Sequence, residues 1–194
     1  MRKINAALFI TLDGVVEAPG PEDTTLPEKR GWSMPYMSDE VGEVIGAGMA
    51  NSDAMLLGRR TYEAFAAFWP NVPADDPIGQ IMNNQTKYVV STTLDEAGWT
   101  NSHLIKGDVA AELGKLKQQP GKDINIVGSG TLTRSLLEAG LVDELQLMLC
   151  PVVLGDGRRL FEDAQFTQSM KVLEVRSFDS GMIYMRLQPE RNNG

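Results

Sequence analysis

Two glycine-led turns, about 70 residues apart, limit most strongly what this chain can fold into. The first is Gly58-Arg59-Arg60-Thr61 and the second is Gly128-Ser129-Gly130-Thr131-Leu132. Each follows a short apolar run and precedes a segment of helical character. Glycine lets the backbone approach a ligand closely, and a helix N-terminus presents free N–H groups and a positive dipole end to a phosphate. The two turns therefore predict a protein that binds a ligand with more than one phosphate.

Short apolar runs alternate with helix-like segments along most of the chain. The expected strands are 6–12, 54–57, 87–90, 124–127 and 144–153, and the expected helices are 39–50, 61–68, 108–119 and 131–139. Residues 170–188 alternate about Ser180-Gly181 and predict a hairpin, whereas 18–37 and 70–80 are predicted loops. This order predicts an α/β fold with a mainly parallel sheet, helices on both faces and an antiparallel C-terminal edge.

The composition is that of a soluble globular protein, with 42% apolar and 23% charged residues among 194, and we expect one domain over 1–194. A net charge of −8 argues against nucleic-acid binding. The single cysteine, Cys150, fits a reducing cytoplasm, and the single histidine, His103, leaves no histidine cluster for a metal. The first apolar run is broken by Thr11 and Asp13, so neither a signal peptide nor a membrane span is expected.

The ends of the predicted strands indicate where a ligand would bind, because ligands of parallel sheets lie at the carboxyl ends of the strands. Gly58, Ser91 and Gly128 all follow predicted strands. The Thr61 hydroxyl and the helix N–H groups could hold a pyrophosphate. Arg59 or Arg60 could then pair with the 2′-phosphate that distinguishes NADP from NAD. The alternative is a strand–helix joint with a solvated arginine pair.

The second turn resembles the start of a dinucleotide fingerprint only in part. Thr133 stands at the third glycine position, and no acidic residue follows at the expected spacing of about 20 residues. A Rossmann domain is therefore disfavoured. A phosphate-binding corner of another α/β fold and a purely structural turn both stay open. Ser91 and Thr92 taken alone fit an ordinary turn as well as a ligand site.

Three carboxylates, Asp39, Glu40 and Glu43, lie near the start of a helix that Ser38 could cap. Such residues ordinarily complement the helix dipole. In a reductase cleft, one of them could orient an amino-heterocycle or deliver a proton. Asp13 is most simply a turn former.

The predicted loop 18–37 is long and carries Trp32 and Tyr36 among polar residues. Loops of this length inside compact domains are often functional. We therefore expect this loop to close over a substrate.

Together, the motifs occur in the order of a known family. They are Thr11-Leu12-Asp13-Gly14, Leu57-Gly58-Arg59-Arg60-Thr61-Tyr62-Glu63, Tyr88-Val89-Val90-Ser91, Ile126-Val127-Gly128-Ser129-Gly130-Thr131-Leu132, Gly140-Leu141-Val142-Asp143-Glu144-Leu145, and the run from Pro151 to Phe161. This set resembles the dihydrofolate reductase-like superfamily, and most of all the reductase half of the bifunctional riboflavin-biosynthesis deaminase–reductase. The resemblance covers about residues 4–188.

The resemblance implies a dihydrofolate reductase-like sheet of about eight strands, with NADPH across its carboxyl edge and a homodimer formed through the C-terminal strands. Asp13 would lie near the nicotinamide. The cofactor-binding residues would be Gly58, Arg59, Arg60, Thr61, Ser91, Thr92, Val127, Gly128, Ser129, Gly130, Thr131 and Leu132. Val127 stands where riboflavin-pathway reductases usually have glutamate, and no deaminase zinc motif is present.

The resulting expectation is an NADPH-dependent reductase that transfers hydride to a small heterocycle, resembling 5-amino-6-(5-phosphoribosylamino)uracil reductase. Asp39, Glu40 and Asp13 are the candidate catalytic residues. Trp32, Tyr36 and Glu43 are the candidate substrate contacts. Two alternatives stay open, a true dihydrofolate reductase and a non-catalytic NADP-binding protein of the same fold.

Overall fold

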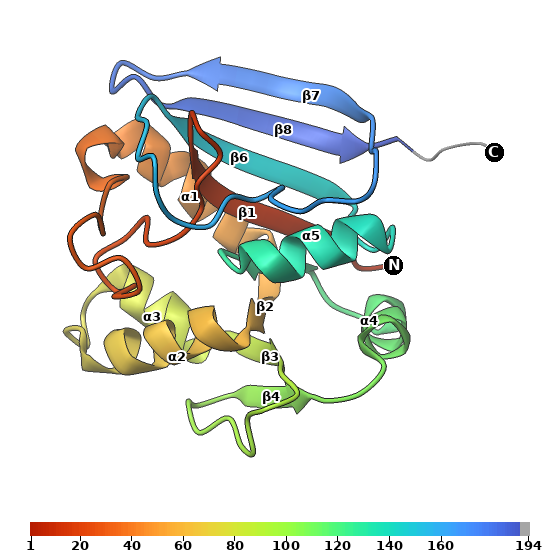
Figure 1. The fold of residues 1–194 in the computed structure, drawn as a ribbon. Coiled ribbons are helices and arrows are strands. Elements are labelled where there is room, and N and C mark those ends of the chain that lie inside the picture. The colour runs from red at the N-terminus through yellow and green to blue at the C-terminus, as the bar shows by residue number, and fades with distance from the viewer. Residues whose placement is uncertain (191–194) are drawn as a thin grey trace.

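Eight strands form one sheet in the order β4-β3-β2-β5-β1-β6-β8-β7 (Figure 1). The computed structural model describes residues 1–190. The strands are β1 (Ile4–Thr11), β2 (Ser52–Gly58), β3 (Thr86–Val90), β4 (Ser102–Ile105), β5 (Asp123–Val127), β6 (Glu144–Cys150), β7 (Met170–Ser177) and β8 (Ile183–Pro189). The strands β4, β3, β2, β5, β1 and β6 pair in parallel, and β8 pairs antiparallel with β6 and β7. The predicted mainly parallel sheet with an antiparallel C-terminal hairpin is confirmed.

The helices are α1 (Asp39–Ala50), α2 (Arg59–Phe68), α3 (Pro77–Asn84), α4 (Val109–Gln118) and α5 (Gly130–Glu138), with short 3-10 turns at Met34–Tyr36 and Trp69–Asn71. Ser38 caps α1 by accepting a hydrogen bond from the Val41 N–H, and Asp108 caps α4 through the Ala111 N–H. Both caps were predicted from the sequence. In the described residues, no helix is long and apolar enough to cross a membrane.

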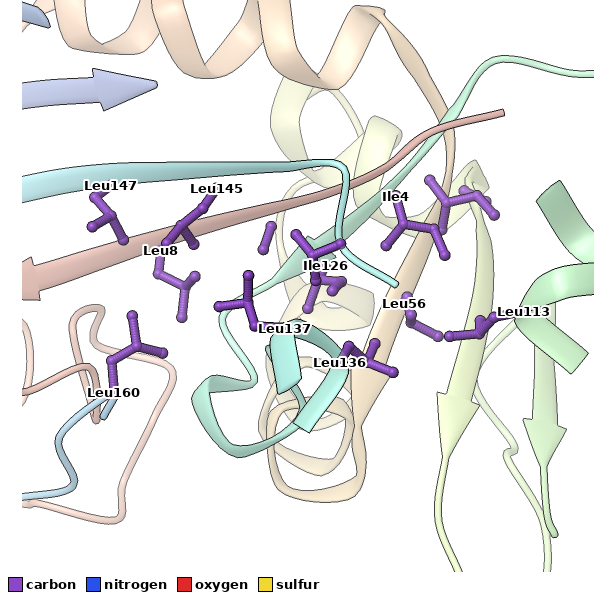
Figure 2. Packing of buried hydrophobic residues seen from close by; sticks show 14 of the residues in the cluster. Ile4, Leu8, Leu56, Leu113, Ile126, Leu136, Leu137, Leu145, Leu147 and Leu160 are labelled. Atoms are coloured by element: carbon purple, nitrogen blue, oxygen red, sulfur yellow. The ribbon is translucent and has the colours of Figure 1, made fainter. Parts of the chain in front are cut away.

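Alternation along the strands divides the core between two faces of the sheet. Leu56 of β2 packs on the face covered by α4 and α5, where Leu113, Leu136 and Leu137 meet the strands (Figure 2). Its neighbour Leu57 packs on the opposite face, under α2 and α3. Helices on both faces were predicted, and the alternation explains them, because successive strand residues point to opposite sides.

Two elements differ from the sequence prediction. The helix α3 occupies the end of the predicted 70–80 loop and continues to Asn84, with Pro77 in its first turn and the Asp76 carboxylate capping the Gly79 N–H at 2.6 Å. Asp-Pro therefore starts a helix here instead of marking a loop. The strand β4 was also missed, because it has only four residues and His103 on it is exposed.

Candidate active site

The two glycine turns lie side by side, because β2 and β5 are neighbouring parallel strands. The Gly58 N–H donates to Ser129 Oγ at 3.0 Å, and the Ser129 N–H donates to Thr61 Oγ1 at 3.2 Å. Two segments about 70 positions apart in sequence are thus joined by hydrogen bonds at one edge of the sheet.

A groove of about 690 Å³ runs along this edge. It is lined by Gly58, Arg59, Arg60, Thr61, Ser129, Gly130, Thr131 and Leu132, together with residues of the 15–25 segment, α4, α5 and Arg158-Arg159. Neither α2 nor α5 has a side-chain cap at its N-terminus. Their first N–H groups are therefore free to meet an anion, and both helix dipoles place their positive ends here.

The second glycine turn has an unusual backbone conformation and packs closely against a neighbouring segment. Gly128 and Ser129 both have left-handed conformations, with φ of 58° and 54°. At Gly130, a Cβ atom would lie 2.6 Å from Val16 Cγ2, so any larger residue would clash. Glycine at 130 thus keeps the start of α5 close to the 15–25 segment at the groove.

Four arginines surround the groove, although the chain as a whole carries a net charge of −8. Arg59 pairs with Glu63 at 2.9 Å, whereas Arg60 forms no ion pair within residues 1–190. The other two, Arg158 and Arg159, come from the loop after β6. Neither residue was predicted from the sequence to belong to the site, although their dipeptide repeats that of Arg59-Arg60.

A second cavity of about 380 Å³ adjoins the groove, and we call it the chamber. Its lining is mostly apolar and comes from β1, the 16–37 segment, α1, α2, α3, β5 and β6. Val16, Asp23, Thr61 and Ser129 line both cavities, so the groove and the chamber meet at the glycine turns.

Glu22 brings an ionisable group to the chamber. Burial raises the pKa of its carboxyl above the ordinary value. Within residues 1–190 it forms no ion pair. Its neighbour Asp23 is engaged, because it accepts hydrogen bonds from the Ala18 and Thr25 N–H groups. The length and composition of this loop predicted a functional role, but no sequence signal pointed to Glu22.

The structure places the predicted acidic residues of α1 away from both cavities. Asp39, Glu40 and Glu43 are exposed, and the chamber is lined instead by the opposite side of the helix, at Val44, Ile45, Gly48 and Met49. The apolar side of α1 faces the sheet, and its carboxylates face outward as an amphipathic helix requires.

The aromatic residues predicted to contact substrate belong to a packed cluster instead. Trp32 is buried beside Val41 and Met148, and its indole N–H donates to the Glu17 carbonyl at 2.8 Å. Tyr36 packs against the same cluster. The loop residues that do line the chamber include Met34 and Met37.

Asp13 holds two loops together. Its carboxylate accepts hydrogen bonds from Thr11 Oγ1 at 2.7 Å and from the Gly155 and Leu154 N–H groups. The Thr11 bond, aided by the two backbone bonds, lowers the pKa of Asp13 to about 2. Asp13 is thus a fixed anion outside the two cavity linings, and it also pairs with the groove residue Arg159 at 3.6 Å.

Four of the predicted cofactor residues do not line the groove. Val127 and Gly128 line the chamber, not the groove. Ser91 and Thr92 line neither, although the preceding Val90 lines the groove. The Ser91 hydroxyl accepts bonds from the Thr93 and Leu94 N–H groups and so braces a turn.

Comparison with known structures defines the class of protein. The fold is dihydrofolate reductase-like: Enterococcus faecalis dihydrofolate reductase, solved with NADP(H), superposes with a TM-score of 0.60 at 13% identity over 97% of both chains. A Shewanella sp. PV-4 protein named for riboflavin biosynthesis gives a TM-score of 0.78 at 19% identity, covering 97% of this chain and 99% of that one.

The sequence identifies the family. Residues 2–184 match the profile of the RibD C-terminal domain, and the chain belongs to this family. The uncharacterized protein YyaP of Bacillus subtilis is 30% identical over 185 residues, which cover 94% of this chain and 92% of YyaP. A Thermotoga maritima deaminase/5-amino-6-(5-phosphoribosylamino)uracil reductase has a TM-score of 0.66 at 14% identity, covering 97% of this chain and 57% of that protein.

Proposed function

We propose that the protein is an NADPH-dependent reductase that transfers hydride to a small heterocyclic substrate, as the reductases of riboflavin biosynthesis do. The observation that carries the proposal is the meeting of the arginine-lined groove and the apolar chamber at Thr61 and Ser129. A dinucleotide and a small substrate need such adjoining sites, because hydride passes directly between them. When bound, the cofactor supplies the hydride from its nicotinamide ring.

The groove has the donors that a dinucleotide phosphate requires. The free N–H groups at the starts of α2 and α5 would hold the pyrophosphate, and Gly130 keeps the start of α5 packed against Val16 at the edge of the groove. Arg60, exposed at the first turn of α2, would pair with the 2′-phosphate of NADPH. Arg158 and Arg159 would add positive potential along the same wall.

Glu22 would provide the proton. Reduction of a C=N or C=O bond adds hydride to carbon and a proton to nitrogen or oxygen. A carboxyl with a raised pKa in an apolar chamber retains its proton to higher pH and is suited to donate it. Glu22 therefore replaces Asp39 and Glu40 as the proposed acid, since the α1 carboxylates face away from the chamber.

The first test is a titration with NADPH and with NADH, followed by tryptophan fluorescence. Trp69 lines the chamber and reports on its occupancy. Micromolar binding of NADPH with much weaker binding of NADH is the expected result. Absence of binding by either nucleotide would contradict the cofactor assignment.

A screen of pyrimidines and pteridines for NADPH oxidation follows. Turnover of at least one of them is expected. Glu22→Gln should lower it most at low pH, where the Glu22 carboxyl holds the proton that it donates, and the two rates should converge at high pH, where that carboxyl is ionised. Tight NADPH binding without oxidation of any compound would favour a non-catalytic NADP-binding protein. Methotrexate binding with reduction of dihydrofolate would favour a true dihydrofolate reductase.

A further inference from the structure

The floor of the chamber carries two carboxamides, Asn125 on β5 and Gln146 on β6. Both strands flank β1, in which Ala7 pairs with Gln146. The neighbouring residues Ile126 and Leu145 point into the opposite core, so Asn125 and Gln146 share the face toward α1. Gln146 thus lies directly beside the methyl group of Ala7, whereas Asn125 pairs with Asn5, two residues earlier on the same strand.

Hydrogen bonds fix the orientation of both amides. Asn125 Nδ2 donates to the Gly48 carbonyl and to Ser52 Oγ, each at 3.1 Å, and Gln146 Nε2 donates to Glu144 Oε1 at 2.9 Å. A carbonyl or carboxylate oxygen can only accept, so these contacts identify the nitrogen of each amide.

The two amide oxygens are left as open acceptors. Asn125 Oδ1 and Gln146 Oε1 accept no hydrogen bond from residues 1–190, and neither belongs to the buried polar atoms that lack a partner. Both side chains line the chamber, so their oxygens are available to donors of a bound molecule. A ligand edge with N–H groups would satisfy them, whereas an edge of oxygen acceptors would not.

The chamber offers nothing to a phosphate. No lysine or arginine belongs to its lining, and its ionisable residues are the carboxylates Glu22 and Asp23. The arginines of the site all line the groove instead. A phosphate placed in the chamber would meet the Asp23 carboxylate as like charge and find no cation to pair with.

The rest of the lining suits a flat ring. Five methionines contribute to it: Met34, Met37, Met49, Met82 and Met148. Thioethers are polarizable and make favourable contacts with aromatic rings. The walls therefore favour a planar apolar face, while the floor selects polar groups on the ring edge.

We infer that the chamber binds an uncharged, unphosphorylated heterocycle whose ring N–H groups donate to Asn125 Oδ1 and Gln146 Oε1. This inference rests on the proposed function and narrows its substrate class. The phosphoribosyl group in the name of the Thermotoga maritima relative has no cation to meet it in this chamber.

The test uses two pteridines that carry either hydrogen or methyl on the same two ring nitrogens. Lumazine has ring N–H groups at positions 1 and 3, and 1,3-dimethyllumazine has methyl groups there. Calorimetric titration of the intact protein saturated with NADPH should show lumazine binding at least about tenfold more tightly, as expected for two lost hydrogen bonds. Equal affinities, tighter binding of the methylated compound or no binding of lumazine would overturn the inference.

Variants then assign the effect to the amides. Gln146→Met should weaken lumazine roughly three- to tenfold and leave dimethyllumazine unchanged, whereas general damage to the chamber would weaken both. Asn125→Leu provides the same test on the other amide. Met148→Leu alters the same cavity without removing an acceptor and should preserve the ratio of the two affinities.

Competition tests the absence of a phosphate site. Uridine 5′-monophosphate should displace lumazine from the NADPH-saturated protein no better than uridine does. Displacement at a tenfold lower concentration by the monophosphate would overturn this part of the inference. NADPH binding is measured separately, and a protein that binds no NADPH would contradict the proposed function. If NADPH binds but the pteridine comparison fails, only the inferred substrate class is contradicted.

Discussion

The backbone N–H of Ser129 donates a hydrogen bond to the Thr61 side chain at 3.2 Å, joining the start of α5 to the start of α2. Ser129 has left-handed backbone geometry at φ 54°, which is uncommon for a residue other than glycine. The Thr61 hydroxyl thus helps hold the second glycine turn in the shape that opens the groove.

Replacement of Thr61 by valine should therefore weaken both the fold and the cofactor site. The change keeps the shape of the side chain but leaves the half-buried Ser129 N–H without a partner, which costs about 1–3 kcal/mol. Urea unfolding should show this loss, and fluorescence titration should show weaker NADPH binding. Thr92→Val, at an exposed threonine without a hydrogen bond, is the control and should change neither.

Arg60 provides the test of nucleotide choice. Arg60→Ala should weaken NADPH binding about 10- to 100-fold, since a hydrogen bond to a charged group contributes roughly 1.5–3 kcal/mol. NADH lacks the 2′-phosphate and should bind with unchanged affinity. Arg176→Ala removes an arginine that lies over Phe178, away from the groove, and serves as the control. Equal losses for both nucleotides would place Arg60 on the pyrophosphate instead.

Most of the sheet could be predicted from the sequence because residues next to each strand and helix mark where it begins or ends. Apolar runs followed by Gly58, Ser91 and Gly128 define strand ends, and Ser38 and Asp108 define helix starts without reference to distant residues. The four-residue strand β4 has no such pattern, since its place depends on pairing with β3. The prediction therefore missed it.

The phosphate groove was partly predictable and the chamber was not. The glycines at 58 and 130 indicate close backbone approaches within their own segments. Arg158 reaches the groove only because the fold brings the loop after β6 next to it. The chamber brings together residues from seven parts of the chain, and Asn125 or Gln146 looks like any strand amide in isolation. The α1 carboxylates were predicted to be catalytic because acidic residues at a helix start can be recognised in the sequence. The direction in which they face cannot.

The ionised Asp13 leads us to expect that its contact with the loop at Leu154 and Gly155 stabilises the fold less at acid pH. Its pKa of about 2 lies below the ordinary value of 3.8, so the unfolded chain binds the proton more tightly than the folded one. The stabilisation by Asp13 is complete above pH 3.8 and is lost as the pH falls toward 2. Asp13→Asn should be less stable than the wild type at neutral pH, and the gap in unfolding free energy should close in this acid range. A gap independent of pH would contradict the role of the charge.

The buried Lys87 leads us to expect a change in the unfolding free energy at alkaline pH. Its side chain is fully buried, donates to the Asn83 and Thr100 carbonyls, and lies 4.1 Å from the ring centre of Trp99. Burial lowers its pKa from 10.5 to about 8. Between these values the unfolded chain binds more protons, so this group adds stability as the pH rises.

Lys87→Met should remove that pH dependence. The unfolding free energy of the wild type, measured against this variant, should rise from about pH 8 to 10.5 and be flat below. Lys171→Met, on the outer strand β7, is the control, because that lysine is exposed. A flat difference across the whole range would mean that Lys87 titrates in the folded protein as it does in water.

The outer strand β7 carries the proposed homodimer contact. Within residues 1–190 no strand lies on its outer side (Figure 1), and Val172 and Val175 are 59% and 58% exposed. Exposed apolar residues on an edge strand favour pairing with another chain. Val172→Lys combined with Val175→Lys should therefore convert a dimer to a monomer in sedimentation, with thermal stability of the sheet largely retained. Val153→Lys, at an exposed valine outside both cavity linings, is the control for added charge elsewhere, and a wild-type protein that sediments as a monomer would contradict the dimer.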